Sequence, residues 1–288
     1  MNEKQKTLRF GIMCNGLSFP AWQAQCLRAV ISLGYVEPAL IIINNRPPVP
    51  QSPLSKRIGR LLTRGVNLFS VYNRYSVARR CLATRPEDLN STLGKVPHLK
   101  CEVVRKGKFS EYFKPDDIAI IRQHELDFIL RFGFNIIRGE ILASAKYGVW
   151  SFHHDDEQKY RGAPPSFWEI YHDDPQTGVV LQRLTERLDG GVILKRGTSP
   201  TILHSYPRNR DAAHWLGVDW PSRVCEDLMG KQAAYLDDPP SKSSAPIYLL
   251  PTNTEMIIFA AKQLLHGIQH AWRLACGRTA AEVRRNIA

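Results

Sequence analysis

The sequence lacks several features that would place it in a specialised class of protein. No stretch approaches about eighteen consecutive apolar residues, so we expect no membrane-spanning helix. The first residues are polar and lead into a short apolar run, without the long apolar segment and cleavage site of a signal peptide. Internal repeats and low-complexity tracts are also absent. We therefore expect a globular protein of the cytoplasm.

The sequence contains few cysteines, and its acidic residues are fewer than its basic ones. The 6 cysteines show no Cys-x-x-Cys spacing, which indicates reduced, mostly buried thiols and argues against a disulfide framework or a cysteine metal site. Lysine and arginine outnumber acidic residues 39 to 27, giving a formal net charge of +12. This charge permits attraction to phosphates, anionic membranes or polyanionic cofactors, but it is equally consistent with a basic surface that serves only solubility.

What is present is an alternation of strands and helices. Residues 8–14 and 36–43 are apolar runs typical of buried strands, and between them apolar residues recur at helical spacing from about Pro20 to Gly34. Ser18 is placed to cap this helix. A strand, a helix and a strand within 45 residues form a βαβ unit, and such units build parallel sheets.

The same alternation continues to residue 152 and gives way to helices after residue 200. We expect one or two basic amphipathic helices over 55–82, covering the edge of the core or attracting an anionic ligand, partner or membrane. The sequence predicts a Rossmann-like α/β domain over 1–200 with a mostly parallel sheet, and a mainly helical C-terminal extension over 201–288. The remaining elements are expected as strands at 99–105, 126–134, 148–152, 178–184 and 247–250, and as helices at 115–124, 136–148, 207–235 and 253–277, the last capped by Asn253 and ended by Gly277.

A dense polar cluster follows the strand at 148–152. Ser151 and His153 are two residues apart, so their side chains lie on the same side of a continuing strand. A histidine at a strand end suits general acid–base catalysis near neutral pH. Asp189 precedes Gly190 and Gly191, and a carboxylate on such a loop can orient an imidazole or a water. The residue types therefore suggest a catalytic pair of His153 and Asp189.

Three other interpretations of the cluster stay open. The sequence His-His-Asp-Asp-Glu at 153–157 could bind a metal, although neighbouring residues in one turn rarely face one ion. Ser151 could act in a hydrolase triad, although no Gly-x-Ser-x-Gly elbow surrounds it. His154 and the acids at 155–157 could simply be solvated loop charges.

The stretch from Tyr147 to Leu194 resembles the core of the formyltransferase family, which includes methionyl-tRNA, glycinamide ribonucleotide and sugar N-formyltransferases. The resemblance extends over 126–196 and implies a Rossmann-like fold. The family's catalytic histidine falls on His153 and its catalytic aspartate on Asp189. The matching motif residues are Tyr160, Arg161, Gly162, Thr177, Gly178, Val179, Leu188, Asp189, Gly191, Ile193 and Leu194.

Two positions depart from the family pattern. The family's catalytic asparagine, which helps to hold the formyl oxygen, is Ser151 here, and a polar loop at 154–158 replaces the family's Ser-Leu-Leu-Pro loop. The altered loop implies a different acceptor, donor or chemistry.

By resemblance, the donor is 10-formyltetrahydrofolate and the acceptor is a primary amine of a small biosynthetic substrate such as an amino sugar. A tRNA acceptor is disfavoured because the C-terminal segment is predicted to be helical, unlike the family's β-barrel tRNA-binding domain. A hydrolase acting through the same site and a catalytically inactive binding relative remain alternatives. The residues expected to act in catalysis are His153, Asp189 and Ser151, and those expected to bind the donor are His154, Asp155, Tyr160, Arg161, Gly162, Gly190 and Gly191.

Overall fold

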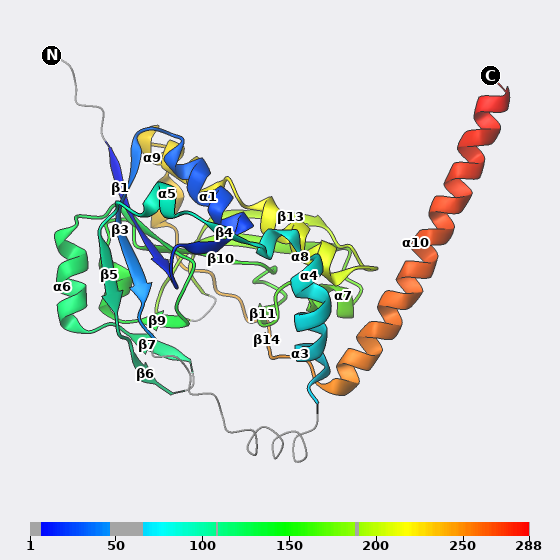
Figure 1. Ribbon diagram of the computed structural model, residues 1–288, viewed down its shortest axis with the longest axis horizontal. Helices are drawn as coiled ribbons and strands as arrows, with labels where there is room; N and C mark the ends of the chain where they lie inside the picture. Colours follow the sequence, from blue (N-terminus) through cyan, green and yellow to red (C-terminus); the bar gives the residue numbers. More distant parts are fainter. Residues whose placement is uncertain (1–6, 47–65, 108, 188–189, 288) are drawn as a thin grey trace.

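A computed structural model describes residues 7–46, 66–107, 109–187 and 190–287, with side chains placed up to residue 276 (Figure 1). A central sheet runs through the molecule. Its strands from β10 to β5 are mutually parallel, whereas β12 is antiparallel to both of its neighbours. The predicted α/β class with a mostly parallel sheet is therefore confirmed. The strand order is β13 (Val192–Pro200), β12 (Gln176–Arg183), β10 (Val149–His153), β8 (Phe128–Arg131), β1 (Leu8–Cys14), β3 (Val36–Asn44) and β5 (His98–Cys101).

The predicted βαβ unit is present as β1, α1 (Ala21–Ile31) and β3, with β1 and β3 paired in parallel. Helix α1 forms because Trp22, Leu27 and Val30 recur on one side and are buried. The prediction that Ser18 caps this helix is wrong. Ser18 lies in β2 (Ser18–Pro20), which pairs with β4 (Pro86–Asp88), and α1 starts directly after Pro20.

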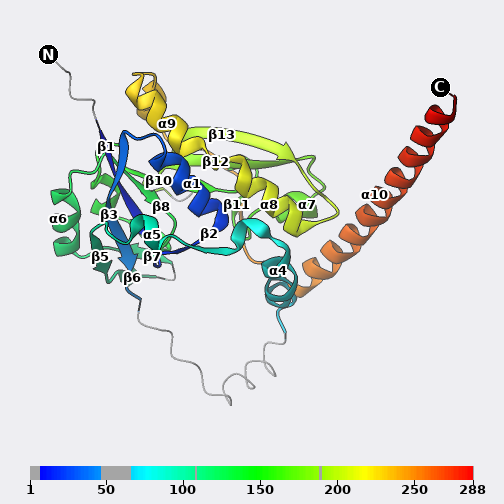
Figure 2. The same cartoon turned by 45° about the horizontal axis from the view of Figure 1, so that its top comes forward.

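Each face of the sheet has its own hydrophobic core. On one face, stacked rings of Phe10, Phe128 and Trp150 pack beneath α1, α8 (Tyr206–Leu216) and α9 (Trp220–Met229) (Figure 2). The other face is covered by α6 (Pro115–Gln123) and a 3₁₀ helix at Glu140–Ala143. The domain boundary expected at residue 200 stays a prediction, but α8 and α9, assigned to the extension, share their core with the sheet.

Several predicted elements differ in length or type. The strand predicted at 126–134 ends at Arg131, and the chain then turns through Phe134, which has a φ of 66°. The helix predicted at 136–148 is instead a strand and a short 3₁₀ helix, because Gly139 at φ 80° interrupts it. The strand predicted at 99–105 is divided in two. A small sheet therefore forms from β6 (Val104–Lys106), β7 (Ser110–Tyr112) and β9 (Ile136–Arg138).

The remaining described elements are short and lie between these layers. The strand predicted at 247–250 is only two residues long and pairs with another two-residue strand, Arg161–Gly162. These elements are α5 (Asn90–Leu93), α7 (Trp168–Tyr171), β11 (Arg161–Gly162), β14 (Ile247–Tyr248) and 3₁₀ helices at Leu82–Thr84 and Ala234–Asp237.

A third core joins the end of the chain to the body. The described part of the basic segment predicted at 55–82 is helical through α3 (Leu68–Tyr72), a π-helical stretch at Asn73–Val77 and α4 (Ala78–Arg80); its residues 55–65 lie outside the described chain. The long helix α10 (Asn253–Ile287) packs its first turns against α3 and α7, with Phe259 stacked on Phe167 at 4.2 Å between ring centres.

Helix α10 differs from its prediction at both ends. Asn253 does not cap it, because its Oδ1 atom accepts a hydrogen bond from the Leu68 amide, whereas Glu255 accepts from the Thr252 amide at 2.7 Å. The helix also continues past Gly277, since a glycine lowers helix stability without ending a helix by itself. Within the described chain, no helix is long and apolar enough to cross a membrane.

Candidate active site

A cavity of about 650 Å³ opens beyond the carboxyl ends of β8 and β10. This is the edge of a parallel sheet where binding sites form, next to β1, where the strand order reverses. Its walls are mostly apolar, with three arginines and few other charged groups. The cavity-lining residues that bear on its chemistry are Phe109, Arg131, Phe134, Ser151, His153, Gly162, Arg187 and Tyr248.

Strand alternation brings three polar side chains to this cavity. Ser151 and His153 are two residues apart on β10, and Arg131 is paired with Ser151 across the β8–β10 ladder. The predicted shared orientation of Ser151 and His153 is therefore present. Ser151 is buried and His153 is largely buried, so both side chains have little contact with water.

The imidazole of His153 is held in one orientation by backbone. Its Nε2 atom lies 3.2 Å from the carbonyl oxygen of Tyr160. Because a carbonyl oxygen only accepts hydrogen bonds, Nε2 carries the proton in this arrangement. The Nδ1 atom is then the basic nitrogen, as a general base requires.

A buried carboxylate accompanies His153. The Oδ2 atom of Asp155 lies 3.7 Å from His153 Nε2, while its Oδ1 atom accepts a hydrogen bond of 2.6 Å from the Ser166 amide. Asp155 is 3% exposed, so its charge is poorly screened. At this distance, an ionised Asp155 could stabilise a positive charge on the imidazole.

A second buried acid, Glu169 on α7, adjoins Asp155. Burial raises the pKa of Glu169 to about 8, and the nearby Asp174 and Asp156 carboxylates add to the increase, whereas the Asp155 side chain partly opposes it. Glu169 is fully buried and is therefore mostly protonated at neutral pH. The two buried acids therefore share a site in which burial favours a protonated carboxyl group.

Arg131 is a site residue that the sequence analysis missed. Its Nη1 atom donates a hydrogen bond of 2.7 Å to Ser151 Oγ, and its Nη2 atom donates one of 2.7 Å to the carbonyl of Asn135. The Asn135 amide in turn donates to the buried Glu111 at 2.8 Å, and Arg46 pairs with the same carboxylate. The available signal was a single arginine within the otherwise apolar run 128–134.

His154, expected to bind the donor, lies on the opposite face of the sheet. Its ring stacks on His214 at 4.3 Å and meets Trp22 edge-on at 4.9 Å. Burial and the neighbouring His214 hold the pKa of His154 well below its usual range. The reason is again alternation, since His154 follows His153 by one residue. It does not line the cavity.

The other residues expected to bind the donor occupy mixed positions. Gly162 lines the cavity, where it pairs with β14 so closely that a Cβ atom would lie 2.1 Å from the Tyr248 carbonyl oxygen. Tyr160 offers its carbonyl to His153, while its hydroxyl bonds Asp174 at 3.3 Å. Arg161 donates to the Ala245 carbonyl at 3.3 Å. Neither Tyr160 nor Arg161 lines the cavity.

Gly190 and Gly191, also expected to bind the donor, do not line the cavity. Gly191 packs against β12, where a Cβ atom would lie 2.4 Å from the Arg183 carbonyl oxygen, and the Gly190 carbonyl accepts from Thr185 at 2.8 Å. Arg187 lines the cavity. Asp189, the expected second catalytic residue, and Leu188 lie outside the described chain.

The interpretation of the 155–157 acids as solvated loop charges is wrong for two of them. Asp155 and Glu157 are buried, and Glu157 pairs with Arg196 on β13. The loop folds inward because Asp155 accepts the Ser166 amide and Gln158 bonds both Glu157 and Ser241, at 3.0 Å and 2.9 Å. Among the described residues, no group of three or more histidine, cysteine or acidic side chains is placed to hold a metal ion.

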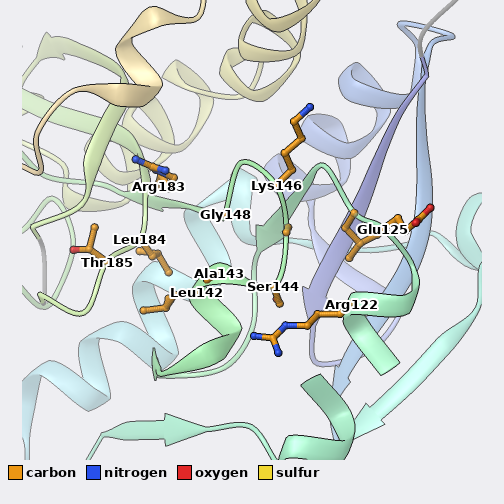
Figure 3. Close-up of a pocket in the computed structure, with 12 residues that line it drawn as sticks. Arg122, Glu125, Leu142, Ala143, Ser144, Lys146, Gly148, Arg183, Leu184 and Thr185 are labelled. Carbon is orange, nitrogen blue, oxygen red and sulfur yellow. The ribbon is translucent and has the colours of Figure 1, made fainter. Parts of the chain in front are cut away.

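A second cavity of about 660 Å³ lies at the amino ends of β8 and β10. Its charged side chains do not converge: Figure 3 shows Lys146 and Glu125 directed away from each other. Arg122 pairs with Glu140 at 3.0 Å, and Arg183 donates to the Leu236 carbonyl. The chemistry-bearing residues therefore belong to the carboxyl-end cavity.

Part of the chain is similar in sequence to known formyltransferases. It is 37% identical over 83 residues to methionyl-tRNA formyltransferase of Prochlorococcus marinus, covering 28% of this chain and 24% of the relative. It is 34% identical over 106 residues to the same enzyme of a Synechococcus species, covering 36% and 28%. The chain thus matches about a quarter of these relatives' length. No family model matches the chain.

A solved structure supports the fold assignment over most of the chain. A sugar N-formyltransferase from a Shewanella species superposes with a TM-score of 0.51 at 12% identity, covering 88% of this chain and 86% of that one. The resemblance to formyltransferases is confirmed, and the fold is a Rossmann-like formyltransferase fold with a helical C-terminal region. The proteins that share it are enzymes.

Proposed function

We propose that the protein transfers a formyl group from 10-formyltetrahydrofolate to a primary amine of a small biosynthetic substrate, such as an amino sugar. The observation that carries this proposal is the placement of His153, with a basic Nδ1, beside the Arg131–Ser151 pair in one cavity at the carboxyl edge of the sheet. The motif matches around His153 supply the reaction type.

The cavity suits the proposed donor in its size and lining. About 650 Å³ lies within the usual range for a small-molecule site. Phe109, Phe134 and Tyr248 supply aromatic surface for a planar ring, and Arg187 supplies positive charge toward an anionic tail. When bound, the donor supplies an activated formyl carbon and leaves as tetrahydrofolate.

The chain's own residues divide the work of the reaction. His153 takes the proton that the amine nitrogen loses as its bond to the formyl carbon forms, and returns a proton to the nitrogen that leaves. Asp155 stabilises the charged imidazole between these steps. Arg131 and the Ser151 hydroxyl offset the negative charge that develops on the formyl oxygen, in place of the family's asparagine. Asp189 remains a proposed second carboxylate.

A small acceptor is favoured over tRNA. Although the relatives matched in sequence are methionyl-tRNA formyltransferases, the described C-terminal region is mainly helical. One solved structure that covers most of both chains is a sugar N-formyltransferase. We propose that the enzyme acts in the cytoplasm.

Two measurements test the proposal. Calorimetric titration with a reduced folate should show binding, and a Phe134→Ala variant should weaken it because the aromatic wall is removed; absence of binding at millimolar folate would exclude this donor. Incubation with 10-formyltetrahydrofolate and a panel of amino sugars should yield a formamide, detected by mass spectrometry. Release of free formate without an amine would instead identify a hydrolase. If Ser151→Asn transfers formyl groups and the natural chain does not, the natural chain is a binding relative.

A further inference from the structure

The exposed side of α10 is an uninterrupted apolar face. At 100° per residue, every position between 257 and 275 that falls within an arc of about 160° is Ala, Ile, Leu or Trp. The large members are strongly exposed, with Trp272 at 69%, Leu264 at 66% and Ile257 at 63%. Figures 1 and 2 both show this helix extending away from the remaining elements.

The polar side of α10 is fixed to the body, so the apolar face cannot turn inward. Lys262 pairs with Asp173 at 2.5 Å, and His266 pairs with the same carboxylate at 2.8 Å. Further along, the ring of His270 stacks on His204 at 4.0 Å between centres. These contacts hold the helix in one rotation about its axis, with the apolar face outward.

Within this face, the spacing is that of a helix–helix seam. Steps of three and four residues alternate from Ile258 to Ala275. A heptad spacing of this kind allows a helical partner to pack along the face, whereas a lipid surface requires no such register. The seam residues are Ile258, Ala261, Leu265, Ile268, Trp272 and Ala275.

We propose that this face packs against the same face of a second copy of the chain, in antiparallel orientation. A two-fold axis near residues 266–267 places Trp272 opposite Ala261 of the second copy. The same axis places Leu265 opposite Ile268, and Ile258 opposite Ala275. Two of the three layers therefore pair a large residue with an alanine, and the central layer pairs leucine with isoleucine, which suits a close-packed interface. A parallel pair would instead place Trp272 against Trp272 and Ala261 against Ala261.

The proposal goes beyond formyl transfer and does not depend on it. The seam spans 258–275, about 27 Å at 1.5 Å per residue, and carries no charge to oppose association of two basic chains. A seam of this length is short for a coiled coil, so we expect a dimer that dissociates on dilution within the range of about 1–100 μM.

The first test measures oligomeric state by analytical ultracentrifugation of the full chain over that concentration range. The natural chain should be dimeric at the upper end. Leu265→Glu should weaken the dimer by a factor of about 100 or more, because the carboxylate would be buried in the seam. Arg273→Glu, which changes charge outside the apolar face, is the control and should leave the dimer intact. A natural chain that stays monomeric throughout would overturn the proposal.

The second test decides the orientation. Trp272→Ala should weaken the dimer by leaving a gap, and Ala261→Trp should weaken it by setting two tryptophans together. The double variant restores one tryptophan and one alanine per layer only in the antiparallel pair, so it should recover the natural affinity. Failure of this recovery excludes the antiparallel seam. Binding to phosphatidylglycerol vesicles is measured as well. A chain that stays monomeric and binds these vesicles through this face would have a lipid-binding surface, and the dimer proposal would be overturned.

Discussion

His153 Nε2 lies 3.7 Å from Oδ2 of Asp155, and both side chains belong to one short segment at the end of β10. The loop at 154–158, which departs from the family pattern, therefore places a buried carboxylate beside His153. We predict that Asp155→Asn lowers kcat by about tenfold with little change in KM, because the amide keeps the Ser166 contact but cannot stabilise an imidazolium charge. Steady-state kinetics with saturating donor checks this. An unchanged kcat would assign Asp155 a purely structural role.

Replacement of the base should have a larger effect. His153→Asn is expected to lower kcat by about 10² to 10⁴, the usual contribution of general acid–base catalysis, while leaving folate affinity within a few-fold. The same change at His98, an exposed residue of the edge strand β5, is the matched control and should not alter kcat. Equal losses in the two variants would rule out a specific role for His153.

The Arg131–Ser151 pair can be tested by a change that keeps the positive charge. Arg131→Lys should lower kcat by about 10² because an ammonium cannot hold Ser151 Oγ and the Asn135 carbonyl at once. Arg122→Lys, in the cavity at the opposite edge of the sheet, controls for the substitution and should be neutral. If the Arg131→Lys variant keeps the kcat of the natural chain, the guanidinium has no specific role in the mechanism.

Glu169 should make stability depend on pH. Burial raises its folded pKa to about 8, so the folded state holds a proton that the unfolded state releases above about pH 4.5. The contribution of Glu169 to the free energy of unfolding is fully present below that pH. It is lost as the pH rises toward about 8, and the loss amounts to up to about 5 kcal/mol. Glu169→Gln stays neutral and should flatten this part of the profile. Urea unfolding of both proteins between pH 5 and pH 8.5 measures the difference; parallel profiles would contradict the assignment.

Local sequence patterns were sufficient where one interaction dominates. The apolar runs at 8–14 and 36–43 form buried parallel strands because most of their side chains are apolar, and the alternation at 151–153 places Ser151 and His153 together. The same alternation, applied one residue further, would have placed His154 on the opposite face. That error came from treating the whole polar cluster as one site.

Other features depend on contacts that no local pattern contains. Arg131 reaches Ser151 across the β8–β10 ladder, and the Asn135–Glu111 contact that supports it links residues 24 apart. The helix predicted at 136–148 failed because its first residues pair with β7, and the gain from that pairing exceeded their helical preference. The predicted end of the last helix at Gly277 is wrong because the whole segment, and not one residue, decides where a helix ends.

The sequence by itself determined the α/β class, the resemblance to formyltransferases and the position of His153, since these follow from periodicity and from motifs that lie close together along the chain. Only the tertiary structure decided which carboxylate accompanies His153, that Arg131 holds Ser151, and that Glu169 is buried beside Asp155. Each of these depends on the distance and solvent exposure of groups from separate elements. Distances between elements and the burial of a side chain are properties of the packed molecule, and local sequence patterns do not predict them.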